Sequence, residues 1–216
     1  MTKALIFDLD NCLALATEVG KDLYEPAFQA IREANDGTVP GEVLEEALAE
    51  AWRHPLDWVA AKYGFSAAML DAGWQVFTAM EVKRPMRAYD DITSIADLPV
   101  QRFLVTSGFR RLQESKIKAL GLAPLFTSTF VDALDEPERL GKGGLFEKIL
   151  ADHKLSPAEV MVVGDSAHSE IAAGNCLGIR TVQTLRPGVP HADNATFHIH
   201  SLAELKALLD EPLSPT

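Results

Sequence analysis

Near its beginning the chain reads Lys3-Ala4-Leu5-Ile6-Phe7-Asp8-Leu9-Asp10-Asn11-Cys12-Leu13. The run that ends at Phe7 is short and apolar, with β-branched and aromatic side chains, which is typical of a buried strand. Asp8 and Asp10 follow it. Because residues two apart in a strand point to the same face, both carboxylates could flank one group if the chain stays extended between them. An isolated Asp-x-Asp also occurs at ordinary strand-to-turn junctions, so its meaning depends on the rest of the sequence.

The chain changes character after this first strand. Between about residues 14 and 85, Ala, Glu, Leu and Trp dominate, β-branched residues become scarce, and apolar residues recur at helical spacing. Breaks occur at Asn35-Asp36-Gly37, Pro40-Gly41, His54-Pro55 and Gly64. This pattern predicts a unit of about four helices without any strand.

After Pro85 short apolar runs alternate with helical segments. The expected strands are residues 102–106, 127–131, 160–163, 179–183 and 196–199, and the expected helices are residues 110–120, 144–153, 168–177 and 202–209. Such alternation indicates a parallel sheet with helices on both faces. We therefore predict an α/β fold, with a Rossmann-like parallel sheet core over residues 1–13 and 86–216 and an inserted all-helical cap over residues 14–85. Residues 211–216 are expected to form a frayed tail.

Composition and charge exclude several classes of protein. The 216 residues include 31 acidic and 20 basic ones, for a net charge of −11, and no stretch has the basic footprint of a nucleic-acid binder. No apolar run approaches the roughly 20 residues that cross a bilayer, and the first apolar run is too short for a secretion signal. Cys12 and Cys176 lack metal-type spacing and are expected to be reduced thiols. We therefore expect a cytoplasmic monomer or homodimer with neither a nucleic-acid nor a membrane partner.

Polar side chains gather where the predicted strands end. In an open parallel sheet, ligands bind outside the carboxyl ends of the strands. The side chains expected at this edge are Asp8, Asp10, Thr106, Ser107 and Asp165, with Lys142 in the loop before a helix. Neighbouring carboxylates need a counter-charge to stay ionised, and Mg²⁺ prefers their oxygen ligands. An acidic protein that binds a negatively charged phosphoryl group must supply positive potential at the binding site. The hydroxyl groups, the lysine ammonium group and the helix N-termini expected here could do so.

Four segments resemble, in order, the four motifs of haloacid dehalogenase-like hydrolases. The segments are Asp8-Leu9-Asp10-Asn11-Cys12-Leu13, Leu104-Val105-Thr106-Ser107-Gly108, Leu140-Gly141-Lys142-Gly143, and Val163-Gly164-Asp165-Ser166 continuing to Glu170-Ile171-Ala172-Ala173-Gly174. The resemblance covers the whole chain, including a helical cap inserted just after the first motif.

The resemblance implies a role for each matched residue. Asp8 would form an aspartyl-phosphate, and Asp10 would act as general acid and then as general base toward water. Mg²⁺ would be held by the Asp8 side chain, the Asp10 backbone carbonyl and Asp165. The phosphoryl group would be bound by Thr106, with Ser107 nearby and Lys142 balancing its charge. Glu170 would contact the metal ion through a bound water.

Three positions depart from the family pattern. Asn11 stands where Thr is commoner, and Glu170 replaces the usual Asp, which leaves direct metal ligation open. Gly143 and Gly144 follow Lys142 where Pro is frequent, so the assignment of this lysine is weaker. Lys116 and Lys118 are rivals, but both fall inside a predicted helix and are expected to face solvent. Thr106 and Ser107 could alternatively be an ordinary helix N-cap.

The predicted cap contains two sets of side chains whose roles the sequence leaves open. The aromatic set, which is expected to be core rather than a substrate platform, is Trp52, Trp58, Tyr63, Phe65 and Trp74. The polar set, which could face either the active site or solvent, is Arg53, His54, Asp57 and Lys62.

These observations lead us to expect a Mg²⁺-dependent phosphatase acting on a small phosphorylated metabolite such as a sugar phosphate, nucleotide or phospho-acid. A phosphotransferase or sugar-phosphate mutase would use the same scaffold but return the phosphoryl group to its substrate. A dehalogenase would attack carbon and need no acid at Asp10. A receiver-like module would bind Mg²⁺ without turnover, although receiver domains are shorter and carry their phosphorylated Asp on a middle strand, where this chain offers only Asp132.

Overall fold

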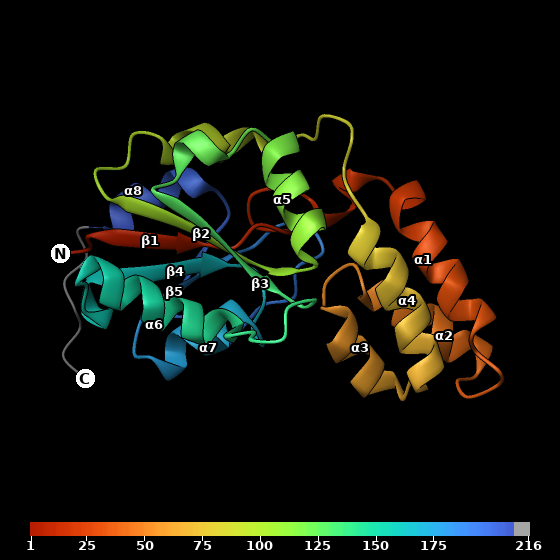
Figure 1. Cartoon of the computed structure of the whole chain (residues 1–216). Helices are drawn as coiled ribbons and strands as arrows, with labels where there is room; N and C mark the ends of the chain where they lie inside the picture. Colours follow the sequence, from red (N-terminus) through yellow and green to blue (C-terminus); the bar gives the residue numbers. More distant parts are fainter. Residues whose placement is uncertain (210–216) are drawn as a thin grey trace.

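The computed structural model describes residues 1–209 and contains a six-stranded parallel sheet (Figure 1). The strands are β1 (Ala4–Phe7), β2 (Gln101–Gly108), β3 (Ser128–Ala133), β4 (Val160–Gly164), β5 (Arg180–Thr184) and β6 (Phe197–Ile199). Their order in the sheet is β3-β2-β1-β4-β5-β6, and every neighbouring pair is parallel. The predicted α/β class with a Rossmann-like parallel sheet is therefore confirmed. The expected tail at residues 211–216 lies outside the described residues.

Two layers of helices cover this sheet. Helices α6 (Gly141–His153) and α7 (Glu170–Cys176) lie on one face, and α5 (Arg110–Ala119) and α8 (Leu205–Leu208) lie on the other (Figure 1). Alternate side chains of β1 point to opposite faces of the sheet. Ile6 packs in the cluster that contains Phe146 of α6, whereas Phe7 packs in the cluster that contains Ile117 of α5. Because a central parallel strand is buried on both faces, it reads as a continuous apolar run, as β1 and β4 do.

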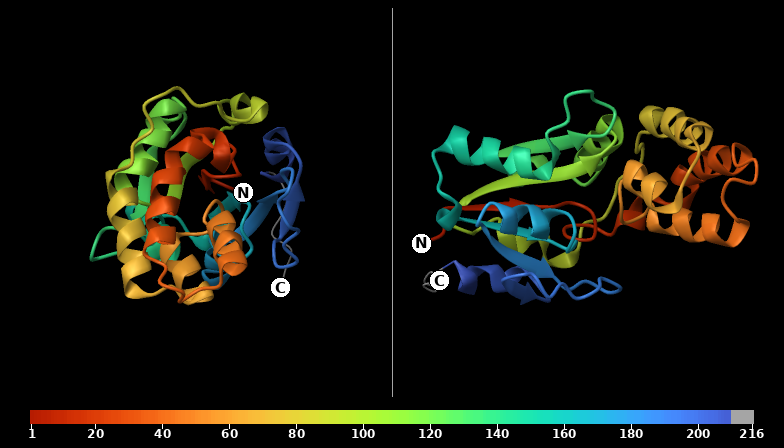
Figure 2. Two further views of the ribbon diagram at one scale, coloured as in Figure 1. Left: turned by 90° about the vertical axis from the view of Figure 1, so that its right-hand side faces the viewer. Right: turned by 90° about the horizontal axis from the view of Figure 1, so that it is seen from below.

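Four helices lie between β1 and β2 in the chain. They are α1 (Lys21–Glu33), α2 (Gly41–Glu50), α3 (Leu56–Tyr63) and α4 (Ala67–Ala79), and we call this group the helical insert. The insert lies beyond the carboxyl ends of the strands and has its own apolar cluster, which includes Ile31, Leu48 and Met69 (Figures 1 and 2). The same cluster reaches Phe109 and Leu112 of the sheet unit. The domain boundaries at residues 13/14 and 85/86 remain a prediction.

Short 3₁₀ helices complete the connections. They are η1 (Ala16–Val19), η2 (Asp90–Ile95), η3 (Ala123–Leu125), η4 (Pro157–Glu159) and η5 (Leu202–Glu204). Among residues 1–209, the helices are all too short or too polar to span a membrane.

The helix expected over residues 202–209 begins as the 3₁₀ helix η5, so α8 starts at Leu205, and two further helix starts differ from the sequence-based expectation. Helix α6 begins at Gly141 rather than at residue 144, because the Gly141 N–H donates to Asp132 Oδ1 at 3.0 Å and so satisfies a free amide of the first turn. Helix α7 begins at Glu170 rather than at residue 168, because Ser169 has non-helical backbone angles (φ −109°, ψ −106°). Both shifts fall beside the functional site described next.

Candidate active site

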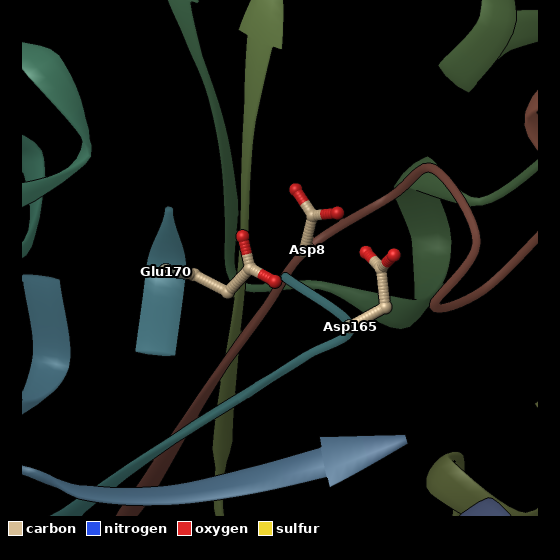
Figure 3. Close-up of side chains that lie close together, drawn as sticks. All are labelled: Asp8, Asp165 and Glu170. Atoms are coloured by element: carbon tan, nitrogen blue, oxygen red, sulfur yellow. The ribbon is translucent and has the colours of Figure 1, made fainter. Parts of the chain in front are cut away.

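Three carboxylates meet at the carboxyl ends of the two central strands. Asp8 follows β1, Asp165 follows β4, and Glu170 opens α7. One oxygen from each carboxylate lies within 4.8 Å of the others, and the three side chains surround a common space (Figure 3). The predicted pair Asp8 and Asp165 is thus brought together, with Glu170 beside it.

A lysine lies against two of these carboxylates. Lys142 Nζ donates to Asp8 Oδ1 at 2.6 Å and to Glu170 Oε2 at 2.7 Å. The prediction that Lys142 lies in a loop is wrong, because the Asp132 contact starts α6 early and puts Lys142 in its first turn. The Gly residues after Lys142 therefore do not move its side chain away from Asp8.

Glu170 is held by two further features. Its Oε1 accepts the Ser166 N–H at 2.6 Å, which closes the turn between β4 and α7. A Cβ at position 164 would come within 2.3 Å of Glu170 Cγ, so only glycine leaves room for this side chain. The expected contact with a metal ion through water stays a prediction, although the side chain lies in the same cluster as Asp8 and Asp165.

The cluster is short of positive charge. Burial raises the pKa of Asp8 to about 7, with Glu170 and Asp10 adding to the rise and Lys142 opposing it. Burial and the charges of Glu170 and Asp8 raise the pKa of Asp165 to about 8. Burial also acts to raise the pKa of Glu170, but Lys142 and the Ser166 amide outweigh it, so that this pKa falls below its usual range. One lysine facing three carboxylates leaves a deficit that a divalent cation with oxygen ligands would fill.

Asp10 lines the same cavity but has different partners. Lys116 Nζ lies 3.1 Å from Asp10 Oδ1 and 2.9 Å from Oδ2, and Gln113 Nε2 donates to Oδ2 at 3.3 Å. The expectation that Lys116 faces solvent is wrong, since the residue is 1% exposed, whereas Lys118 is exposed as expected. The buried face of α5 runs through Leu112, Gln113, Lys116 and Ile117. This i, i+4 spacing from Leu112 was the signal that could have identified Lys116.

The two predicted hydroxyl residues lie at the end of β2. Thr106 is buried and lines the cavity, and Ser107 Oγ donates to Asp132 Oδ2 at 2.9 Å. They are not an N-cap, because the residue that caps α5 is Phe109 and it makes no side-chain cap hydrogen bond. Both residues therefore belong to the cavity wall.

The cavity has a volume of about 110 Å³ and lies between the sheet and the insert. It is lined by Asp8, Asp10, Thr106, Ser107, Lys142, Asp165 and Glu170 from the sheet unit, and by Tyr24, Trp52, Arg53, His54 and Phe77 from the insert and its connections. A second cavity of about 420 Å³ shares Ser107, Lys142 and Ser166 with the first. The predicted site residues thus converge on one cavity, with a second one adjoining it.

The side chains predicted for the cap divide between core, cavity and surface. Trp52 is half-buried, lines the smaller cavity and stacks on Tyr24 at a centroid distance of 4.2 Å, while Trp58 is exposed at the wall of the larger one. The expectation of core positions was therefore wrong for Trp58, which stacks on His54 instead of packing inside the insert. Of the polar set, Asp57 pairs with Arg139 across the cavity, and Lys62 pairs with Glu50 inside the insert.

Comparison with known proteins gives two curated relatives at low identity. YfnB of Bacillus subtilis, which its name describes as a HAD-hydrolase, is 26% identical over 157 residues, covering 69% of this chain and 65% of the relative. Pyrimidine 5′-nucleotidase PynA of Streptococcus pneumoniae is 22% identical over 143 residues, covering 64% of this chain and 59% of the relative. The matched part thus spans less than two thirds of either relative.

Solved structures share the fold. Magnesium-bound YfnB superposes with a TM-score of 0.64 at 18% identity, covering 97% of this chain and 99% of that one. A 2-haloacid dehalogenase from Pseudomonas syringae gives a TM-score of 0.59 at 21% identity, covering 97% and 98% of the two chains. Because these neighbours include a protein named as a dehalogenase, the shared fold does not by itself define the reaction of this chain.

The family itself is shown by a sequence match. The profile of the family described as haloacid dehalogenase-like hydrolase matches residues 2–178, which include β1, the whole insert and the four segments that hold Asp8, Thr106, Lys142 and Asp165. The protein whose sheet edge gathers these residues belongs to the haloacid dehalogenase-like hydrolase family.

Proposed function

We propose that this hydrolase is a Mg²⁺-dependent phosphatase that cleaves a small phosphorylated metabolite through an aspartyl-phosphate on Asp8. The observation that carries the proposal is that two carboxylates with different partners line one cavity. Asp8 is buried against Lys142 at 2.6 Å, and Asp10 lines the same cavity. A phosphatase needs both a nucleophile and a proton donor, whereas a dehalogenase attacks carbon and needs no acid at position 10.

The chain's own residues support a two-step reaction. An Asp8 oxygen attacks phosphorus, the ester bond breaks, and its electron pair goes to the leaving oxygen, which takes a proton from Asp10. In the second step Asp10 takes a proton from water as the water oxygen attacks phosphorus. The bond between phosphorus and the Asp8 oxygen breaks, and its electron pair restores the Asp8 carboxylate as phosphate leaves. Thr106 would donate to a phosphoryl oxygen, Ser107 would lie beside it with its hydroxyl held by Asp132, and Lys142 would neutralise charge.

Mg²⁺ would be held by the side chains of Asp8 and Asp165 and by the backbone carbonyl of Asp10. When bound, it would supply the positive charge that the buried cluster lacks and stabilise the negative charge of a phosphoryl group. Glu170, which is held by Lys142 and the Ser166 amide, would contact the ion through a bound water.

The test is release of phosphate from p-nitrophenyl phosphate with Mg²⁺ or with EDTA. We expect turnover that EDTA abolishes, and an Asp8→Asn variant that loses at least about 10³-fold in kcat while its melting temperature does not fall. Asp152→Asn is the matched control, because Asp152 is an exposed carboxylate that pairs with Lys148 on the same helix. Full activity of the Asp8→Asn variant, or turnover unaffected by EDTA, would contradict the proposal.

The substrate is addressed by a screen of sugar phosphates, nucleoside monophosphates and small phospho-acids. The pyrimidine 5′-nucleotidase relative gives a reason to include pyrimidine nucleotides. A mutase is the second candidate, and isomer formation without free phosphate would favour it. Binding of Mg²⁺ and phosphate analogues without turnover would instead favour a receiver-like module.

A further inference from the structure

The cavity contains a buried ammonium group that the proposed chemistry does not use. The Lys116 side chain is only 2% exposed, and its ion-pair partner within residues 1–209 is Asp10. A buried ion pair is weak evidence for stability, because the cost of removing two charges from water offsets their attraction. An apolar residue would suit this face of α5, which otherwise buries Leu112 and Ile117, so the lysine calls for another explanation.

The contacts of Lys116 suggest why a lysine is buried here. Lys116 binds both oxygens of Asp10, at 3.1 and 2.9 Å, which fixes the plane of the carboxylate as well as its position. Gln113, one helical turn earlier, donates to Asp10 Oδ2 and to the Ser107 carbonyl at 2.8 Å, and so links Asp10 to the end of β2. Gln113 Oε1 is buried and lacks a hydrogen-bond partner in the described part of the chain. The amide is thus oriented toward Asp10 although its own oxygen stays unsatisfied, which is costly.

Lys116 also contacts the helical insert. Its Nζ lies 6.0 Å from the ring centroid of Tyr24 in α1, and Tyr24 stacks on Trp52 at the cavity wall. The ammonium group therefore lies between Asp10 on the sheet side and an aromatic ring on the insert side. Asp10, Lys116 and the Tyr24 ring thus form a continuous series from the sheet edge to the insert.

We propose that Lys116 is a positioning residue for Asp10, which it holds, together with Gln113, in the orientation that delivers a proton to the leaving oxygen. This inference rests on the proposed phosphatase function. Because Lys116 contacts both oxygens of Asp10, one oxygen can give up or take a proton while the other stays bound. A positioned acid contributes about 10²–10⁴-fold to a rate, so a misplaced Asp10 should cost part of that factor.

The test compares two aryl phosphates of similar shape. p-Nitrophenyl phosphate releases a stabilised anion that needs little protonation, whereas phenyl phosphate releases a much more basic oxygen. We expect Lys116→Met to lower kcat/KM for phenyl phosphate at least tenfold more than for p-nitrophenyl phosphate, and Lys116→Arg to recover part of the loss. Lys118→Met, an exposed lysine on the same helix, is the matched control and should behave as the wild type.

The outcomes separate the two proposals. If the wild type does not cleave p-nitrophenyl phosphate, the phosphatase proposal fails. If the wild type is active and Lys116→Met affects both substrates equally, or neither, the positioning role of Lys116 is wrong. If Lys116→Met melts far below the wild type, Gln113→Leu is measured instead, with the same selective loss expected at smaller size and an equal loss for both substrates counting against the proposal.

Discussion

At the scale of single residues, the carboxylate cluster makes the protein sensitive to pH. Asp8 and Asp165 have pKa values of about 7 and about 8 in the fold, above the value of about 3.9 for an unfolded Asp. The folded state therefore binds more protons than the unfolded state between pH 4 and pH 8. Stability from these two groups is present at low pH and is lost as the pH rises through this window.

This linkage gives a prediction for Asp165→Asn. Without metal at pH 8, the variant should be more stable than the wild type by an amount on the order of a few kcal/mol, because it removes a buried charge. Near pH 4 the difference should vanish. Mg²⁺ should raise the melting temperature of the wild type at pH 8 but leave that of the variant unchanged. Thermal melts with EDTA and with Mg²⁺ at both pH values check this, and a Mg²⁺ shift retained by Asp165→Asn would exclude Asp165 as a ligand.

At the scale of elements, the packing of α7 against β4 controls Glu170. A methyl group at position 164 would overlap Glu170 Cγ, Cδ and Oε1, a side chain that is already fixed by Lys142 and Ser166. We expect Gly164→Ala to destabilise the fold by about 1–3 kcal/mol through overpacking and to weaken the effect of Mg²⁺ on the melting temperature.

The control for this change lies on α6. A methyl group at Gly143 would have nothing within 4 Å, and the residue is helical. Gly143→Ala should therefore raise stability by about 0.5–1 kcal/mol, as expected for a helical Gly. Urea unfolding of both variants checks the pair, and equal effects would show that the space at Gly164 is unimportant.

Elements also explain how far the sequence could predict this protein. The apolar run before Asp8 and the alternation after Pro85 are local patterns, and they predicted the sheet and the placement of Asp8, Thr106 and Asp165 at its edge. The start of α6 depends on a hydrogen bond to Asp132, which lies in β3, nine residues before Gly141. The local sequence pattern around Gly141 therefore could not predict where the helix begins. The sequence analysis predicts that Lys116 faces solvent like Lys118, although Leu112 and Ile117 mark its face of the helix as buried.

At the scale of the whole molecule, few polar contacts join the insert to the sheet unit across the cavity. Arg139 Nη1 donates to Asp57 Oδ2 at 2.6 Å, and its Nη2 donates to Asp132 Oδ2 at 2.8 Å. Arg53 Nη2 donates to the Gly188 carbonyl at 2.6 Å. Asp132 accepts from Ser107 as well, so Arg139 connects the insert to the wall of the cavity.

This arrangement predicts a modest effect for Asp57→Asn. The Asp57 side chain is 40% exposed, so its ion pair is worth about 0–1 kcal/mol, or at most about fivefold in the balance between a closed and an open insert. We expect KM to rise by up to about fivefold with little change in kcat, and amide hydrogen exchange in α3 to become faster. Glu45→Gln, which breaks the Arg32 ion pair inside the insert, should change neither. A fall in kcat with unchanged KM would argue against a role in closure.

The two connections of the insert leave the sheet side by side, since the Tyr89 N–H donates to the Leu13 carbonyl at 2.9 Å. The chain therefore leaves the sheet unit and returns to it at neighbouring positions. A different insert with the same two attachment points could replace this one without disturbing the pairing of β1 with β2. A chimera carrying a foreign insert would keep the residues at the sheet edge, but it would change the wall of the cavity and remove the Tyr24 ring that lies beside Lys116.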